Sequence, residues 1–444
     1  MATRIPPTAP VLPQPPGADD GPPPPELPAA AVDRWRAEGG GMVDLLRLVQ
    51  RLGPVAAVRL GPQPTVLVTG PEAVQHVLAH HPDRYVKRSH RARILVGDGV
   101  LSAAGDAWKR QRKVLQSQFT GPGMRRFEQR IDRAADRCAD RWAGYARTGQ
   151  EVDLAAELRH FALDTIWRAL TGHALDDRTA GELATVGRVV TALPVLPADA
   201  VDARAAVAEE LARIDAVALR AIDAARTGGP GPHGPGLLHV LLDAGADRAE
   251  YTDRLIRDEL VTLLVAGHET TATTLTWLYL FLDGHPEALE RALAAGGPQS
   301  PERRAAIQAL VSETLRLYPV AWLLPRHATE ADLVTGHRIE AGTDVLVSPY
   351  LTHRVAELWP EPDRFDPERF TTPGRRPAHP GAYLPFGIGA RACLGLQFAL
   401  RETTVLLERL LPAYLPRLRT APPGPVFDFT VRPDGPVPAV ITRR

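Results

Sequence analysis

One of the two cysteines of the chain lies in a glycine- and arginine-rich stretch, Phe386–Gly395, with the sequence FGIGARACLG. Glycines allow backbone conformations in which amide N–H groups converge on a sulfur atom, and the helix expected at Leu394–Leu410 begins directly beside Cys393. Its positive dipole end favours a thiolate, the form of cysteine that binds metals. Arg391 and hydrogen bonds to sulfur would also tune a thiolate–iron bond. The stretch therefore indicates a metal ligand at Cys393, whereas we interpret Cys138 as a small buried hydrophobic residue.

Polar residues interrupt the longest apolar region of the chain. The run AGHETT, Ala266–Thr271, places glycine, charge and hydroxyl groups inside a helix expected at Thr252–Asp283. The Thr270 hydroxyl can bond the carbonyl oxygen of Ala266, four residues earlier, which loosens the helix and makes room for a small ligand. An acid, Glu269, beside this hydroxyl suits proton delivery. The alternative, a solvent-facing patch, disagrees with the apolar runs on both sides.

Several arginines are candidates for binding an anionic group. Trp108 and Arg112 share one helical face at positions i and i+4 in GDAWKRQRK, Arg326 follows YPVAWLLP, and Arg391 lies in the cysteine loop. A guanidinium group forms forked hydrogen bonds with carboxylates. For any one arginine alone, a solvated surface charge is the alternative.

These motifs resemble the signatures of the cytochrome P450 superfamily, the heme-thiolate monooxygenases, over roughly residues 40–440. The cysteine loop fits F-x-x-G-x-R-x-C-x-G at every fixed position, and AGHETT fits A/G-G-x-D/E-T-T/S. The resemblance implies that Cys393 is the axial ligand of the iron of a non-covalently bound heme b. It also implies that Glu269 and Thr270 relay protons to O2, the co-substrate, that Gly267 borders the oxygen pocket, and that Ala266 and Gly267 are cofactor-binding positions. His268 occupies the variable position, and we interpret it as an ordinary polar residue.

The same resemblance assigns further residues to the cofactor, the fold and the substrate. The other cofactor-binding positions that it implies are Trp108, Arg112, Arg326, Phe386, Arg391 and Gly395. ETLR and PERF imply a buried, structural ion-pair network of Glu313, Arg316 and Arg369. The expected substrate pocket includes Leu263, Val320, Trp322, Leu323 and Phe427, with the segments Lys87–Leu101 and Val189–Val201. For Trp322, core packing is an equal alternative.

The composition excludes several classes of protein. Lys and Arg total 52 and Asp and Glu total 52, so the chain offers no net field for nucleic acid or an anionic membrane. Two cysteines in 444 residues form no disulfide framework, which fits a reducing cytoplasm. Because His268 and Glu269 interrupt the longest apolar region, we expect a buried helix and no transmembrane anchor.

The pattern along the chain predicts a mainly α protein with small β-sheets. The resemblance makes this the cytochrome P450 fold, with heme between the long helix and the cysteine loop with the last helix. Residues 1–30 are expected to form a proline-rich, disordered arm, and residues 31–444 a single catalytic domain. Strands are expected at Val320–His327, Leu333–Ile339, Asp344–Ser348 and, as a pair, within residues 53–71. Further helices are expected at Pro71–His80, Ala104–Phe119, Met124–Thr148, Leu154–Thr171, Arg178–Ala192, Ala200–Arg226 and Pro301–Tyr318.

The resemblance implies a monooxygenase that hydroxylates or epoxidises a hydrophobic small molecule, as in the tailoring of terpenes or polyketides in secondary metabolism. Electrons are expected from NAD(P)H through a separate ferredoxin and ferredoxin reductase, because no reductase segment follows the cysteine loop. Lys109, Arg110 and Lys113 are candidates for the docking face of an acidic donor. The alternatives are a fatty-acid hydroxylase, an oxygen-independent isomerase or dehydratase on the same scaffold, and a non-catalytic heme sensor.

Overall fold

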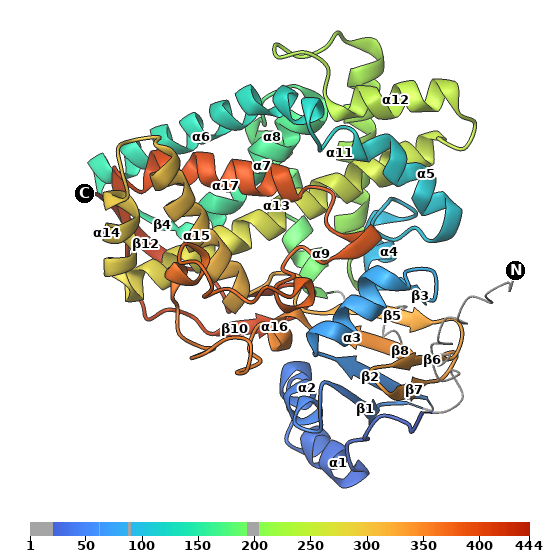
Figure 1. Cartoon of the computed structure of the whole chain (residues 1–444). Helices are drawn as coiled ribbons and strands as arrows, with labels where there is room; N and C mark the ends of the chain where they lie inside the picture. Colours follow the sequence, from blue (N-terminus) through green and yellow to red (C-terminus); the bar gives the residue numbers. More distant parts are fainter. Residues whose placement is uncertain (1–20, 62, 88–89, 193–203) are drawn as a thin grey trace, which may run out of the picture.

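The helix α13 (Asp253–Gly284) runs for 32 residues through the middle of the molecule (Figure 1). The Thr252 side chain caps it by accepting a hydrogen bond from the Leu255 amide at 3.3 Å. Both faces of α13 are largely buried, so its apolar residues pack on all sides rather than along one stripe. An added Cβ at Gly267 would lie 2.7 Å from the Ile166 side chain, so this glycine lets α13 approach the neighbouring helix closely.

The computed structural model describes residues 21–61, 63–87, 90–192 and 204–444. Helices form the larger part of the described chain, and the main sheet lies beside them with α1 and α2 below it (Figure 1). The predicted mainly α fold with small sheets is confirmed. The other helices are α1 (Ala29–Ala37), α2 (Met42–Gln50), α3 (Pro71–Gln75), η1 (a π-helix, His76–His80), α4 (His90–Val96), α5 (Gly105–Gln116), α6 (Pro122–Thr148), α7 (Leu154–Thr171), α8 (Asp177–Leu183), α9 (Val186–Ala192), α11 (Ala208–Thr227), α12 (Leu237–Asp247), α14 (Pro286–Ala294), α15 (Pro301–Leu317), α16 (Pro349–Thr352) and α17 (Leu396–Leu410).

The main sheet has five strands in the order β1-β2-β8-β5-β3. All of its neighbouring strands are antiparallel except β2 and β8, which are parallel. Three smaller sheets have the orders β4-β12-β9, β6-β7 and β10-β11. The strands are β1 (Val55–Arg59), β2 (Pro64–Val68), β3 (Tyr85–Val86), β4 (Glu151–Asp153), β5 (Leu324–Ala328), β6 (Asp332–Val334), β7 (His337–Ile339), β8 (Asp344–Val347), β9 (Tyr414–Leu418), β10 (Pro425–Phe427), β11 (Val431–Pro433) and β12 (Pro438–Arg443).

Several boundaries follow directly from local chemistry. The prediction of a helix at Leu154–Thr171 is confirmed, because Asp153 caps its start and Gly172 adopts a left-handed conformation with φ 84° at its end. The strand pattern at Leu333–Ile339 is a hairpin, β6–β7, whose turn has positive φ at Thr335 and Gly336.

Two predictions from the sequence need correction. The single helix predicted at Arg178–Ala192 is two helices, α8 and α9, and between them the Thr185 hydroxyl bonds the Glu182 carbonyl at 2.9 Å. The expected irregular arm does not extend to residue 30, because the Leu27 amide donates to Ala57 O at 2.8 Å and α1 begins at Ala29. Residues 1–20 lie outside the described residues, as do 200–203 of the helix predicted at Ala200–Arg226.

The helices of the described residues include no candidate for a membrane span. None of them is both long and apolar enough to cross a bilayer. Although α13 is long enough, His268 and Glu269 lie in its buried middle.

A buried ion-pair network joins α15 to the chain before the cysteine loop. Arg316 and Glu313, both fully buried, pair at 2.7 Å, and Arg369 Nε lies 3.4 Å from Glu313 Oε1. Arg316 also donates to the carbonyl oxygens of His353 and Arg364, each at 3.0 Å. The network therefore fixes irregular chain onto a helix, as the structural role predicted for these three residues requires.

Replacing Arg316 with alanine tests this role. We expect Arg316→Ala to lower the free energy of unfolding by about 3–5 kcal/mol, because it leaves the Glu313 carboxylate buried without its partner. Urea unfolding measures the change. Arg364→Ala is the control, because it breaks the exposed Arg364–Glu361 pair and is expected to cost less than about 1 kcal/mol. Equal losses in the two variants would contradict the role.

Candidate active site

The cysteine loop is closed by its own backbone and rests on a neighbouring helix. The Cys393 amide donates to Phe386 O at 2.8 Å. Gly389 has φ 74°, and an added Cβ there would clash with the carbonyl oxygen of Leu78 in η1. Gly395 precedes α17, and its amide donates to the Cys393 sulfur. Gly389 thus lets the loop lie directly against η1, and Gly395 provides an N–H donor to the Cys393 sulfur.

The Cys393 side chain is exposed, yet the protein around it is dense enough that burial raises the pKa of its thiol. The Gly395 amide and the Arg112 charge lower the pKa, but less than burial raises it. The loop and helix end therefore do not make a thiolate by themselves, and a bound metal ion is needed to deprotonate the sulfur.

Four cationic side chains gather beside the loop: Lys87, Arg112, Arg326 and Arg391. Burial, then the charges of Arg326 and Arg391, lower the pKa of Lys87 to about 7. Burial alone lowers the pKa of Arg326 to about 10, and burial with the charges of Arg326 and Arg112 lowers that of Arg391 to about 10. Within the described chain, none of the four forms an ion pair with a carboxylate.

The hydrogen bonds of these cations position them without neutralising them. Arg112 donates to Ala392 O and Arg391 to Ala103 O, both at 2.8 Å, and the Arg391 guanidinium lies 4.0 Å from the centre of the Trp108 ring. Carbonyl oxygens and an aromatic face carry no full negative charge. The cluster therefore fits an anionic group, and the two carboxylates of a heme beside a cysteine ligand have the matching chemistry.

On α13, the hydroxyl–carbonyl bond that the sequence predicts is present, while the helix runs unbroken from Asp253 to Gly284. Thr270 Oγ1 donates to Ala266 O at 2.8 Å. Ala266 is exposed although most of the helix around it is buried, so this turn of α13, like Cys393, has a surface that a ligand can contact. Gly267 has no side chain, and a side chain at this position would point at Ile166 of α7.

The acid of the motif is held by two residues that the sequence analysis did not assign. Glu269 Oε1 lies 3.1 Å from Arg159 Nε and 3.2 Å from His268 Nε2. Burial would raise the pKa of Glu269, but His268 and then Arg159 outweigh it and lower the pKa to about 2. His268 is 1% exposed and also bonds Leu264 O at 2.8 Å, so it is a buried partner of the acid and not an ordinary polar residue.

A second buried acid connects α13 to the last helix. Thr271 Oγ1 donates to Glu402 Oε1 at 2.6 Å, and burial raises the pKa of Glu402 well above its usual value. A neutral carboxyl therefore joins the helix of the AGHETT motif to the helix that follows the cysteine loop. No local sequence signal identifies this pair, because the two residues are 131 positions apart.

The side chains predicted to contact substrate fall into two groups. Leu263 belongs to the main hydrophobic cluster around α13. Trp322 instead belongs to the hydrophobic cluster that includes residues of α1 and α2, and Phe427 packs against this cluster. The centres of the two rings are 5.2 Å apart, and Trp322 Nε1 donates to Asp428 O. For Trp322 the contacts thus support core packing. Val320 is also buried, Leu323 packs against the same cluster, and residues 193–201 of the segment Val189–Val201 lie outside the described residues.

Comparison with known proteins gives consistent matches over most of the chain. The family model described as Cytochrome P450 matches residues 22–195 and 232–431. Cyclooctatin synthase of Streptomyces melanosporofaciens is 30% identical over 408 residues, covering 86% of this chain and 87% of that protein. Carotene epsilon-monooxygenase, chloroplastic, of Arabidopsis thaliana is 29% identical over 417 residues, covering 84% and 76%. The crystal structure of CYP175A1 from Thermus thermophilus superposes with a TM-score of 0.75 at 27% identity, covering 94% of this chain and all of that one.

Replacing Arg159 tests its ion pair with Glu269. A carboxyl whose pKa is about 2 in the fold and about 4.5 when unfolded stabilises the protein above pH 4.5, and this contribution is lost as pH falls towards 2. We expect Arg159→Leu to raise the pKa of Glu269 and to cost about 1 kcal/mol at pH 6, since Arg159 is partly solvent-exposed. The cost should shrink in urea unfolding at pH 3.

The matched control is Arg178→Leu, which removes an exposed arginine from its pair with Glu182 on α8. It should show a smaller cost at pH 6. If the cost of Arg159→Leu were the same at pH 6 and pH 3, Arg159 would not act through the Glu269 charge.

Proposed function

Because this chain belongs to the cytochrome P450 family and is a monooxygenase of secondary metabolism, we propose that it oxidises a terpene hydrocarbon or terpene alcohol at a heme bound by Cys393. The observation that carries the assignment of the site is the cluster of four cations beside Cys393, Lys87, Arg112, Arg326 and Arg391, none of which has a carboxylate partner in the described chain.

Cys393 and the cations beside it have roles toward the cofactor that follow from their positions. Cys393 would bind the iron, and the Gly395 amide and Arg112 would lower the electron density on its sulfur. Arg326, Arg391 and Lys87 would neutralise the heme carboxylates, and Trp108 stacks on the Arg391 guanidinium. When bound, heme supplies the iron chemistry that splits O2 and transfers one oxygen atom.

The chain's own part in that chemistry is to deliver protons and exclude water. Thr270 Oγ1, held by Ala266 O, donates a hydrogen bond toward the space beside Ala266 when it rotates away from the helix. The Glu269 carboxylate is bound on its outer side by Arg159, which is partly exposed to solvent. Release from Arg159 lets Glu269 take a proton and pass it to Thr270 Oγ1.

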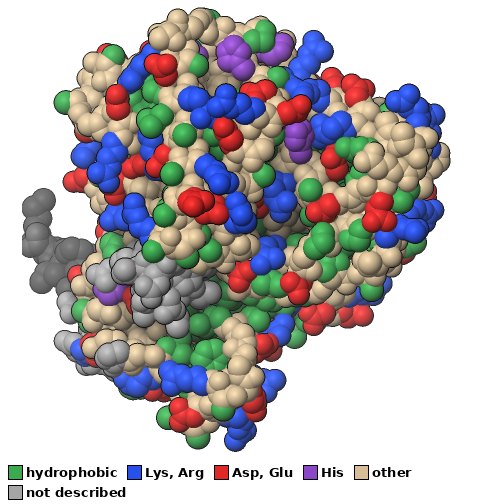
Figure 2. Space-filling view, turned by 180° about the vertical axis from the view of Figure 1, so that it is seen from behind, with side chains coloured by type: hydrophobic (Ala, Val, Ile, Leu, Met, Phe, Trp, Pro, Cys, Tyr) green, Lys and Arg blue, Asp and Glu red, His purple; other side chains and the backbone are tan. Residues whose placement is uncertain are grey.

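We infer the substrate class from an apolar surface and from the relatives. Hydrophobic side chains gather in the lower half of the face shown in Figure 2. An apolar surface binds a molecule with few hydrogen-bonding groups. The names of two similar proteins refer to cyclooctatin and to carotene, and this supports a terpene over a polyketide or a fatty acid.

An electron donor would approach the opposite side of the cysteine loop. A shallow hollow of about 390 Å³ lies there, lined by Trp108, Lys109, Arg112, Lys113, Gln116, Gly389 and Ala390. Its charged side chains are all cationic, which fits an acidic ferredoxin that receives electrons from NAD(P)H through a ferredoxin reductase. Cys138 and Cys393 are both free thiols, as expected in a reducing cytoplasm. We assign the chain from the Leu27–Ala57 contact onward, α1 included, to one catalytic domain.

Turnover with labelled oxygen tests the proposed function. Terpene hydrocarbons and alcohols that change the spin state of the iron would be incubated with NADPH, ferredoxin, ferredoxin reductase and ¹⁸O2. We expect one ¹⁸O atom in the product. We expect Thr270→Ala to lower product formation about 10²-fold while NADPH consumption continues, because the proton donor is lost.

Thr276→Ala is the matched control, because Thr276 Oγ1 bonds Ala272 O at 2.8 Å in the same way within α13 but outside the motif. It should retain the product yield of the natural chain. Product without label, or turnover without O2, would favour the isomerase or dehydratase alternative.

A further inference from the structure

Two successive carboxylates near the start of α13 hold the backbone of the segment that joins α4 to α5. Asp258 Oδ2 accepts a hydrogen bond from the Asp98 amide at 2.9 Å, and Glu259 Oε2 accepts one from the Val100 amide at 3.0 Å. The segment is a series of turns, in which the Gly99 amide bonds Val96 O and the Ser102 amide bonds Gly99 O, and this leaves the Asp98 and Val100 amides for the two carboxylates. We call these two bonds the carboxylate latch.

Glycines on both sides of Asp98 make the latch possible. Gly97 has φ 55°, and an added Cβ there would clash with the Asp258 carboxylate. A Cβ at Gly99 would clash with Thr262 Oγ1 and lie 2.7 Å from Asp258 O. The segment therefore lies directly on α13, at a distance that only glycine allows.

The latched segment also holds the helix that carries Trp108 and Arg112. Gln111 Nε2 donates to Asp98 O at 3.0 Å, and the Ala103 carbonyl at the end of the segment accepts from Arg391 at 2.8 Å. A continuous set of hydrogen bonds thus leads from α13 through the segment to α5 and the cation cluster. Val100 and Leu101, between these anchors, pack against the hydrophobic cluster that contains Leu263.

The latch buries two acids with unequal compensation. Asp258 is 3% exposed and pairs with Arg257 Nη1 at 2.6 Å. Glu259 is fully buried, and its Oε1 has no hydrogen-bond partner among the described residues. Burial raises the pKa of Glu259 to about 7, against the Val100 amide, which lowers it, and with the Asp258 charge, which raises it.

The groups around Glu259 leave it as the titrating member of the latch near neutral pH. Tyr251, in the loop before α13, has a pKa raised above its usual value by burial and then by the Glu259 charge, so it faces Glu259 as a neutral phenol. From the segment, Asp98 pairs with Arg93 at 3.3 Å, and from α11, Asp215 pairs with Arg257.

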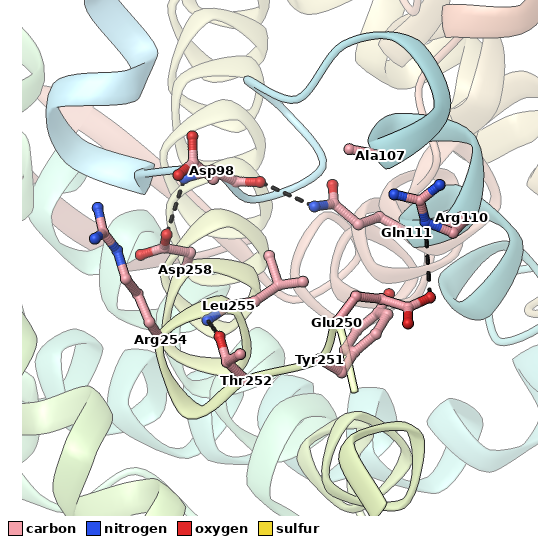
Figure 3. Close-up of a pocket in the computed structure, with 10 residues that line it drawn as sticks. All are labelled: Asp98, Ala107, Arg110, Gln111, Glu250, Tyr251, Thr252, Arg254, Leu255 and Asp258. Atoms are coloured by element: carbon pink, nitrogen blue, oxygen red, sulfur yellow. Dashed lines mark hydrogen bonds and ion pairs between the residues drawn. The ribbon is translucent and has the colours of Figure 1, made fainter. Parts of the chain in front are cut away.

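A hollow of about 240 Å³ lies directly outside the latch (Figure 3). Asp98, Gln111 and Asp258 line one side of it, and Tyr251 and Leu255 another, with the Arg110–Glu250 ion pair, 3.6 Å long, at its edge. Gln111 Oε1 and the Tyr251 hydroxyl are buried and unpartnered within the described chain. Polar atoms at the wall of a hollow give water a path to the latch when the segment lifts.

We propose that Asp258 and Glu259 are positioning residues: they fix residues 97–103 on α13, so that Val100 and Leu101 limit how large a molecule reaches the iron. The inference rests on the proposed function for the nearby cofactor. Opening the latch would hydrate both carboxyl groups and free Val100 and Leu101 to move away from α13, which enlarges the access route without changing the iron ligand.

Hydrogen exchange of the backbone amides tests the latch itself. In Asp258→Ala and Glu259→Ala we expect exchange in residues 97–103 to become about tenfold faster, while α17 keeps its protection. Glu259→Gln keeps an acceptor for the Val100 amide and should retain protection. The matched control is Glu250→Gln, at the edge of the same hollow but outside the latch. Unchanged exchange in residues 97–103, or an equal increase in α17, would overturn the proposal.

The pH dependence of the same exchange gives a second criterion. A buried carboxyl with a pKa of about 7 favours the closed segment while protonated, and this preference is lost as pH rises through 7. We expect lower protection of the Val100 amide at pH 8 than at pH 6, after correction for intrinsic exchange, and no such difference in Glu259→Gln. The same difference in Glu259→Gln would contradict the role of Glu259.

Binding of two azoles to the iron of the heme-loaded protein tests the effect on access. We expect Asp258→Ala to raise the association rate of 4-phenylimidazole about tenfold and to leave that of imidazole, which is smaller, unchanged. Equal changes for both would overturn the proposal. A chain that binds no heme would instead contradict the proposed function, and the exchange experiment, which needs no heme, keeps the two failures distinct.

Discussion

The placement of four partly or fully buried cations without a carboxylate partner in the described chain is the constraint on which the rest of the site depends. Lys87, Arg112, Arg326 and Arg391 come from four separate parts of the chain, and burial lowers the pKa of each of them. An arrangement of this kind is stable only where an anion compensates it, because isolated buried charges are costly. Because the cluster lies beside Cys393, the fold suits a cofactor that carries two negative charges and a metal that deprotonates the thiol.

Three buried acids on or beside the central helix differ in how their charge is controlled. Glu269 stays charged because His268 and Arg159 bind it. Burial keeps Glu402 neutral although Thr271 bonds it, and Glu259 titrates near neutral pH under the segment that it holds. The three acids lie on or against α13 and differ mainly in their partners. A charged acid with a partly exposed partner suits proton entry, a neutral one suits packing, and a titrating one suits an adjustable contact.

Sequence reasoning succeeded where the physical cause is local. The helix at Leu154–Thr171 and the Thr270–Ala266 bond depend on residues within a few positions. Arg159 was missed because it meets Glu269 across 110 positions, and nothing in LRHF predicts that contact. Trp322 shows the same limit, because it lies within the strand predicted at Val320–His327 but before the observed β5, and packs on Phe427 from a distant part of the chain. The short helices α1, α2, α12 and α14 lacked a periodic signal long enough to stand out.

The most direct measurement is the carbon monoxide difference spectrum of the reduced, heme-loaded protein. Cys138 provides the control, because it is the other cysteine of the chain and is buried between helices. The account predicts that the natural chain and Cys138→Ala show the red-shifted Soret band of thiolate ligation and that Cys393→Ala lacks it. A Cys393→Ala protein that keeps this band, or a natural chain that never shows it, would contradict the account.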